Sequence, residues 1–184
     1  MHPGCGIFHI SFTGHLMKTE PPAEQLTAIH SQVIAAREGR EPRVFARLFS
    51  GWALFGERQF VRGYSLLLPD PVVSNLNALG AQERIAFLSD MSRLGDALLK
   101  VTGAERINYA IFGNEEPALH AHVIPRYQDE PEALRRAQPW AYDWSAAPLF
   151  ERASCAELAE QLLRELTRMG VTKPMRYLPG ENAD

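Results

Sequence analysis

The residues best able to do chemistry are two histidines in the segment 119–126, which reads LHAHVIPR. His120 and His122 are one residue apart in an apolar run that favours a β-strand. Because the side chains of a strand alternate between its two faces, we expect both imidazoles on the same face. Two adjacent imidazoles make a poor hydrophobic core, so the pair indicates a site.

Three roles are open for this pair. One histidine could be a nucleophile and the other a proton carrier, since a neutral imidazole is reactive near neutral pH. The pair could instead hold a metal ion, which needs a third ligand. A hydrogen-bonded structural pair is the third possibility. The other histidines lie in the N-terminal part of the chain and bring no second His-x-His or His-x-x-Glu companion: His2, His9, His15 and His30.

The composition is that of an ordinary globular protein. Of its 184 residues, 46% are hydrophobic and 22% charged, which suffices for one domain with a substantial core. The formal net charge of -3 excludes an overall basic surface, so we expect no long nucleic acid as a partner. Cys5 and Cys155 form no CxxC pair, and no apolar run has membrane length. Without a recognisable signal peptide either, we expect a cytoplasmic protein that does not enter a membrane.

Apolar periodicity predicts three helices. An apolar residue recurs every three or four positions in 26–36, in 81–100 and in 158–169. The last helix is preceded by a capping box, Ser154 with Glu157. The apolar stripe of the long middle helix is expected at Ile85, Leu88, Met91, Leu94 and Leu98.

Between the helices, β-favouring runs predict an antiparallel sheet. The strands are expected at 44–49, 52–55, 63–69, 107–112 and 119–126. The turn at 113–117 joins the last two, which should therefore pair antiparallel. The order of elements predicts an α+β domain with a mainly antiparallel sheet of about five strands and a long helix packed on it. The polar segment 128–148 is expected to be a loop or arm, whose Trp140 and Trp144 could cover the site, a partner subunit or a small apolar cluster.

We divide the chain into three segments. Residues 1–42 form an N-terminal extension with a helix, 43–130 the core domain, and 131–184 a C-terminal arm with a helix. Residues 1–16 lack clear periodicity, and a more regular sequence follows Met17 directly. We therefore expect Met17 to be the natural start.

The turn and strand at 113–126, GNEEPALHAHVIPR, resemble the histidine triad (HIT) superfamily. The resemblance extends over about 47–129, nearly half the chain, and includes the strand at 62–69 and the long helix after it. It implies a HIT-like fold with the N-terminal and C-terminal helices added outside the shared core.

The family motif is three histidines that alternate with apolar residues. Ala118 stands at the position of the first histidine, whereas His120 and His122 stand at the second and third. The resemblance implies that His120 is the nucleophile and that His122 touches the phosphate or gives a proton to the leaving group. A backbone carbonyl that accepts the other N–H of His120 would fix the tautomer needed for attack. Asn114, in the turn beside the strand, is our candidate for stabilising charge on the phosphoryl oxygens.

Four further residues are candidates for substrate binding. Glu57 falls where the family places an acidic or amide residue that holds the ribose hydroxyls. Arg47 and Trp52, near the first hairpin, could line a base pocket. Arg126 follows the histidine strand and could meet phosphate. Ordinary structural roles remain open for each of these residues.

The resemblance implies a nucleotide hydrolase or nucleotidyl transferase that acts at a nucleoside α-phosphate through a nucleotidyl-histidine. Diadenosine polyphosphates, nucleoside phosphoramidates and nucleotide sugars all suit this chemistry. No metal cofactor is needed for the covalent step, although a magnesium–nucleotide complex could be the substrate. A homodimer is also implied. A non-catalytic nucleotide-binding or signalling protein is the main alternative because the motif is short by one histidine, and a metal-dependent enzyme that uses the His-x-His pair is the weaker one.

Overall fold

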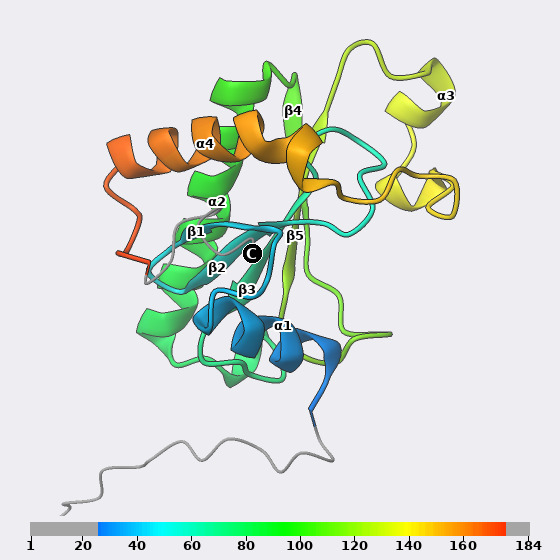
Figure 1. Cartoon of the computed structure of the whole chain (residues 1–184). Coiled ribbons are helices and arrows are strands. Elements are labelled where there is room, and N and C mark those ends of the chain that lie inside the picture. Colours follow the sequence, from blue (N-terminus) through cyan, green and yellow to red (C-terminus); the bar gives the residue numbers. More distant parts are fainter. Residues whose placement is uncertain (1–25, 176–184) are drawn as a thin grey trace, which may run out of the picture.

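An antiparallel sheet forms the centre of the molecule (Figure 1). The computed structural model describes residues 26–175. The strands are β1 (Val44–Arg47), β2 (Gly51–Phe55), β3 (Ser65–Pro69), β4 (Arg106–Ala110) and β5 (Ala121–Arg126). They lie in the order β1-β2-β3-β5-β4, and each neighbouring pair is antiparallel. The predicted α+β class with a five-stranded antiparallel sheet is confirmed.

Helices cover both faces of this sheet. Those of the described residues are α1 (Ala28–Arg37), α2 (Ala81–Thr102), α3 (Glu132–Arg135) and α4 (Arg152–Arg168). Figure 1 shows α4 lying across α2. The long helix α2 ends where Gly103 takes a φ of 71°, a left-handed conformation that glycine adopts without strain.

Two apolar clusters, one on each face, hold the layers together. Leu67 of β3 belongs to the cluster under α2 and α4, whereas its neighbours Leu66 and Leu68 belong to the cluster under α1. This is the alternation expected of a strand buried on both faces. The cluster under α2 and α4 includes Phe45, Phe55, Leu98, Leu162 and Leu166, and the one under α1 includes Ile29, Val33, Trp52 and Ile124.

The predicted stripe of α2 is wrong in its first half. Ile85 is 61% exposed and Leu88 is 37% exposed. The buried face of α2 instead consists of Phe87, Asp90, Leu94, Gly95, Ala97 and Leu98. The polar member is Asp90, whose carboxylate accepts hydrogen bonds of 2.7 Å from both the backbone N–H and the hydroxyl of Ser50. Apolar periodicity does not predict the burial of Asp90, because this burial depends on hydrogen-bond donors in a turn far away in the sequence.

The predicted capping box of the last helix is also wrong. Helix α4 already begins at Arg152, because the backbone N–H of Cys155 donates to the carbonyl of Glu151 at 3.1 Å. Ser154 lies inside the first turn, where its hydroxyl donates to the Glu151 carboxylate at 2.8 Å. The capping-box signal therefore lies about three residues inside the true start of the helix.

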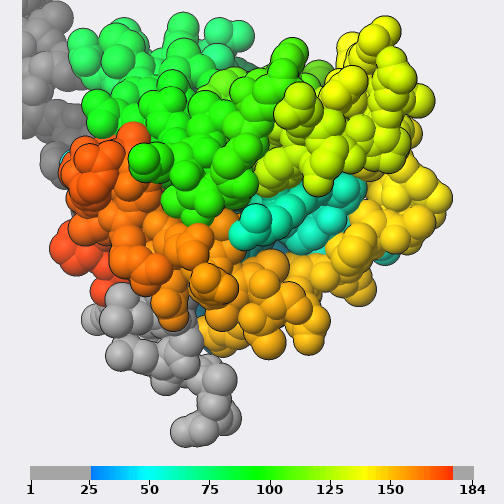
Figure 2. Space-filling view, turned by 90° about the horizontal axis from the view of Figure 1, so that it is seen from above, coloured from blue at the N-terminus to red at the C-terminus, as the bar shows by residue number. Residues whose placement is uncertain are grey.

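The predicted arm at 128–148 contains two short helical turns and is tied back to the sheet. It holds α3 and a 3₁₀ turn at Pro139–Ala141. Where the arm leads into α4, the N–H of Gln59 donates to the carbonyl of Pro148, and the N–H of Phe150 donates to that of Glu57. Figure 2 shows the result, with the segment that follows β2 lying against the segment that precedes α4.

Both terminal helices share apolar clusters with the central strands, α4 in one cluster and α1 in the other. The predicted segment boundaries at 42/43 and 130/131 stay predictions.

Met17, which is predicted to be the natural start, lies outside the described residues, as do both ends of the chain at 1–25 and 176–184. Within residues 26–175, no helix has the length and apolar character needed to cross a membrane.

The position of Leu162 makes the attachment of α4 testable. Its side chain is fully buried between α4, α2 and the sheet. We expect Leu162→Ala to lower the free energy of unfolding by about 2–5 kcal/mol, because it leaves a cavity in a shared core. Chemical denaturation followed by circular dichroism should still show a single transition. Leu149→Ala, at a position that is 59% exposed, is the control and should change stability by less than about 0.5 kcal/mol. A separate early transition for α4 would contradict the shared core.

Candidate functional site

The two histidines lie side by side at the start of β5. His122 pairs with Leu66 of β3 and with Ala110 of β4, and His120 immediately precedes the strand. The ring centroids are 4.9 Å apart and the ring planes are inclined by 69°. Both rings line a pocket of about 630 Å³. This volume is within the range of small-molecule sites.

His120 is held by its own backbone. Its Nδ1 lies 2.8 Å from the carbonyl oxygen of Ala118, and the residue is only 8% exposed. A carbonyl oxygen can only accept, so Nδ1 carries the proton and Nε2 keeps its lone pair. Ala118, which stands where the HIT motif has its first histidine, thus contributes a backbone atom to the site.

Glu116 holds the segment that carries this carbonyl. One carboxylate oxygen accepts the N–H of Ala118 at 3.0 Å, and the other accepts the N–H of Ala28 at 3.1 Å. Ala28 is the first residue of α1, whose N–H has no partner within the helix. The carboxylate therefore joins the start of α1 to the backbone that orients His120.

His122 is held by a side chain. Its Nδ1 lies 2.6 Å from the hydroxyl oxygen of Tyr64, a residue that is 3% exposed. Burial, together with the neighbouring His120, lowers the pKa of His122 to about 4. The ring is therefore neutral at pH 7.

Aromatic and acidic side chains form the rest of the pocket wall. Trp140 lies edge-on to Phe112 at 4.7 Å between centroids, and the two are 44% and 46% exposed. Trp140 also lies 5.8 Å from the ring of His122. Beside these three residues and His120, the described lining consists of Asn114, Glu115, Glu116, Gln138 and Trp144. It includes no arginine or lysine, so its fixed charges are negative.

Three of the predicted site residues come together in this pocket, namely Asn114, His120 and His122. Arg126 does not line it, because its guanidinium forms an ion pair with Glu130 at 2.8 Å in which both side chains are 5% exposed. The same guanidinium donates to the carbonyls of Leu134 and Ala137. Arg126 thus anchors the arm at 128–148 to the end of β5 instead of facing the pocket.

The other predicted binding residues also lie outside the lining. Arg47 stacks on Trp52, with its guanidinium carbon 4.9 Å from the ring centroid. Both contact Asp70, which accepts the indole N–H at 2.9 Å and lies 3.4 Å from Arg47. Glu57 is exposed, and its backbone carbonyl binds Phe150. The base-binding and ribose-binding roles of these residues stay predictions.

Two residues of the site, Tyr64 and Glu116, were not predicted from the sequence. The signal for Tyr64 is the register of the sheet: Leu66 pairs with His122, so Tyr64, two residues before Leu66, lies on the same face as the histidine. Glu116 was passed over as part of a turn. Its role depends on α1, which lies 88 residues earlier in the chain.

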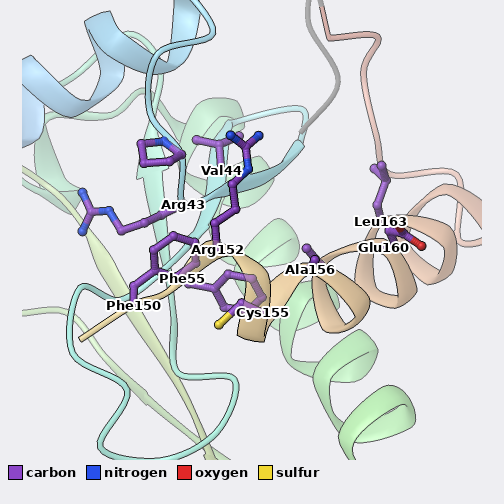
Figure 3. A pocket seen from close by; sticks show the side chains of 11 residues that line it. Arg43, Val44, Phe55, Phe150, Arg152, Cys155, Ala156, Glu160 and Leu163 are labelled. Atoms are coloured by element: carbon purple, nitrogen blue, oxygen red, sulfur yellow. The ribbon is translucent and has the colours of Figure 1, made fainter. Parts of the chain in front are cut away.

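A second pocket, of about 420 Å³, lies between the β1–β2 hairpin and α4 (Figure 3). Phe55 and Phe150 form part of its mainly apolar wall, and Arg43 and Arg152 lie at its border. None of the predicted site residues lines it.

For a metal ion, a third ligand would have to join the histidine pair. Within residues 26–175, no group of three or more histidine, cysteine, aspartate or glutamate side chains is placed to hold one.

Comparison with solved structures identifies the fold. A histidine triad protein from Marinobacter aquaeolei gives a TM-score of 0.62 at 19% identity over 77% of this chain and 97% of that one. A hypothetical histidine triad nucleotide-binding protein from Sulfolobus tokodaii gives 0.60 at 12% identity over 84% and 99%. The diadenosine triphosphate hydrolase of Plasmodium falciparum, in complex with cyclomarin A, gives 0.53 at 14% identity over 70% and 78%. No family model matches the sequence, and a search of curated proteins finds no match.

The chain therefore has the histidine triad fold, as its histidine strand predicts. At these identities the likeness establishes the fold.

The lowered pKa of His122 can be measured directly. Its ring protons should show no titration shift between about pH 5.5 and 8 in a nuclear magnetic resonance experiment and should titrate near pH 4. An unfolded histidine takes up its proton near pH 6.5, so the unfolded state binds more protons than the folded state between these two values. Stability should therefore fall as the pH falls from 6.5 to 4. His122→Asn assigns the resonances, and a midpoint near 6.5 in the folded protein would contradict the buried, neutral ring.

Proposed function

We propose that the chain is a nucleotide hydrolase or nucleotidyl transferase of the histidine triad type, in which His120 attacks the α-phosphate of a nucleotide. The hydrogen bond from His120 Nδ1 to the carbonyl of Ala118 carries the proposal, since it leaves the Nε2 lone pair for attack. The fold supports it, because solved structures with this fold include a diadenosine triphosphate hydrolase and a nucleotide-binding protein.

The proposed reaction has two steps. First, Nε2 of His120 forms a bond to phosphorus while the bond from phosphorus to the leaving group breaks. His122 supplies a hydrogen bond or a proton to the leaving group, and Asn114 donates its amide N–H to a phosphoryl oxygen. Water in a hydrolase, or another acceptor in a transferase, then attacks phosphorus and releases His120. The covalent step uses no metal, and a magnesium ion could arrive bound to the nucleotide.

The charges of the pocket favour a neutral or cationic leaving group. Glu115 and Glu116 are part of the lining, and no basic side chain of the described residues joins them. A departing polyphosphate would meet negative charge, whereas an amine released from a phosphoramidate would not. We therefore place nucleoside phosphoramidates ahead of diadenosine polyphosphates as substrates. The exposed rings of Trp140 and Phe112 provide a surface on which a base can stack.

We also propose that the protein forms a homodimer. Strand β4 lies at an edge of the sheet, and its Tyr109 is 41% exposed, so this edge could pair with a second copy of the chain.

Non-catalytic nucleotide binding is the second candidate function. The observation that favours it is Ala118 at the position of the first histidine. This second function needs the same pocket but no attack by His120.

The nucleophile is tested by His120→Ala. We expect a loss of turnover of about a thousandfold or more on an adenosine phosphoramidate, the scale for removing a group on which the mechanism depends. Product release followed by chromatography measures the rate, and calorimetry with AMP should show that binding is largely retained. His30→Gln, at the start of α1 and outside the pocket, is the control. Full activity of His120→Ala would exclude covalent catalysis by this residue. An inactive wild type that still binds AMP would favour the binding function.

The preference for the leaving group is tested by Glu115→Lys. This change replaces an exposed negative charge at the pocket with a positive one. We expect kcat/KM for diadenosine tetraphosphate to rise about fivefold at low salt, and the gain to shrink at 0.5 M salt as the charges are screened. Glu157→Lys, which makes the same charge change on the exposed face of α4, should leave the ratio of the two substrates unchanged. An equal rise for both variants would show that net charge alone is responsible.

A further inference from the structure

Tyr64 is the one tyrosine whose hydroxyl meets a histidine in the described part of the chain. Its oxygen lies 2.6 Å from Nδ1 of His122, and the two rings are stacked at 5.9 Å with an interplanar angle of 6°. Trp144 packs edge-on against Tyr64 at 5.5 Å, and Phe60 packs against it at 4.8 Å. The side chain of Tyr64 is therefore buried, and its neighbours hold the phenol ring in place.

The direction of this hydrogen bond follows from what each group can do. The buried hydroxyl of Tyr64 has no acceptor other than His122 among residues 26–175, and a buried O–H without an acceptor is costly. Burial also raises the pKa of Tyr64, so the phenol keeps its proton. His122 is neutral and can accept at Nδ1. The tyrosine therefore donates, and the histidine carries its own proton at Nε2.

No other titratable group around His122 competes with Tyr64 for the hydrogen bond at Nδ1 among the described residues. The residues whose rings face it are Tyr64, His120, Phe112 and Trp140, and of these only the first two are titratable. Nδ1 of His120 is already engaged by the carbonyl of Ala118. The two adjacent imidazoles consequently hold opposite tautomers, with a lone pair at Nε2 of His120 and an N–H at Nε2 of His122.

We propose that Tyr64 is a positioning residue that fixes His122 in its Nε2–H tautomer, so that this histidine presents a donor where His120 presents an acceptor. The assignment of a role in catalysis rests on the proposed function, whereas the tautomer itself does not. In the proposed reaction the Nε2–H group of His122 gives a hydrogen bond, or its proton, to the leaving group as the bond to phosphorus breaks. Tyr64 transfers no proton of its own, because burial raises the pKa of its phenol and this effect outweighs the opposing charge of Arg43.

The tautomer is measured by nitrogen-15 nuclear magnetic resonance of histidine-labelled protein at pH 7. In the wild type we expect His122 to show a protonated Nε2 and an unprotonated Nδ1, and His120 to show the reverse. Tyr64→Phe keeps the ring and removes the hydroxyl, so it should convert His122 to a mixture of tautomers and leave His120 unchanged. Tyr127→Phe is the matched control, because its hydroxyl donates to the carbonyl of Arg62 outside the pocket. A protonated Nδ1 on His122 in the wild type would overturn the proposal without any variant.

Kinetics of the same variants separate this inference from the proposed function. We expect Tyr64→Phe to lower kcat on an adenosine phosphoramidate by about two- to threefold with little change in KM, because the donor is then present in only part of the molecules. Unchanged kcat together with a changed tautomer would remove the catalytic role of Tyr64. If the wild type turns over none of the substrates, the proposed function fails, and the tautomer experiment still decides the hydrogen bond.

Discussion

The central position of β5 is the constraint on which the rest of the site depends. The strand is paired with β3 on one side and β4 on the other, so His122 sits on a backbone held by two ladders. His120 lies just before the strand, where the chain can turn its imidazole toward the carbonyl of Ala118. The same strand ends at Arg126, whose ion pair with Glu130 fixes the arm that brings Trp140 to the pocket. One strand therefore places both histidines and, through the arm, Trp140 of the pocket wall.

Much of this arrangement could be predicted because it follows local rules. Alternation along the predicted strand at 119–126 places His120 and His122 on one face, and the predicted turn at 113–117 implies the antiparallel pairing of β4 with β5. The strands themselves are shorter than predicted, and residues 111–120 join them. The buried face of α1 was likewise predictable, because Ile29, Val33 and Ala36 recur at helical spacing. These features depend on residues that are close in the sequence, so one sequence is enough to predict them.

The features that escaped prediction depend on partners far away in the sequence. The contact of Tyr64 with His122 requires the register between β3 and β5, and the contact of Glu116 with Ala28 requires the docking of α1. The sequence shows that Arg126 can bind an anion, either a phosphate or a carboxylate, and the fold of the arm places Glu130 beside it. In each case the residue type indicated the kind of interaction, and the tertiary structure chose the partner.

The bond between His120 and Ala118 has a consequence for how such proteins can be found. The group that orients the imidazole is a main-chain oxygen, which every amino acid has. The residue type at position 118 therefore gives no sign of this hydrogen bond. What the position does require is an amide hydrogen for Glu116, which excludes proline. A search for three alternating histidines therefore does not select this chain, whereas comparison of backbones recovers its fold.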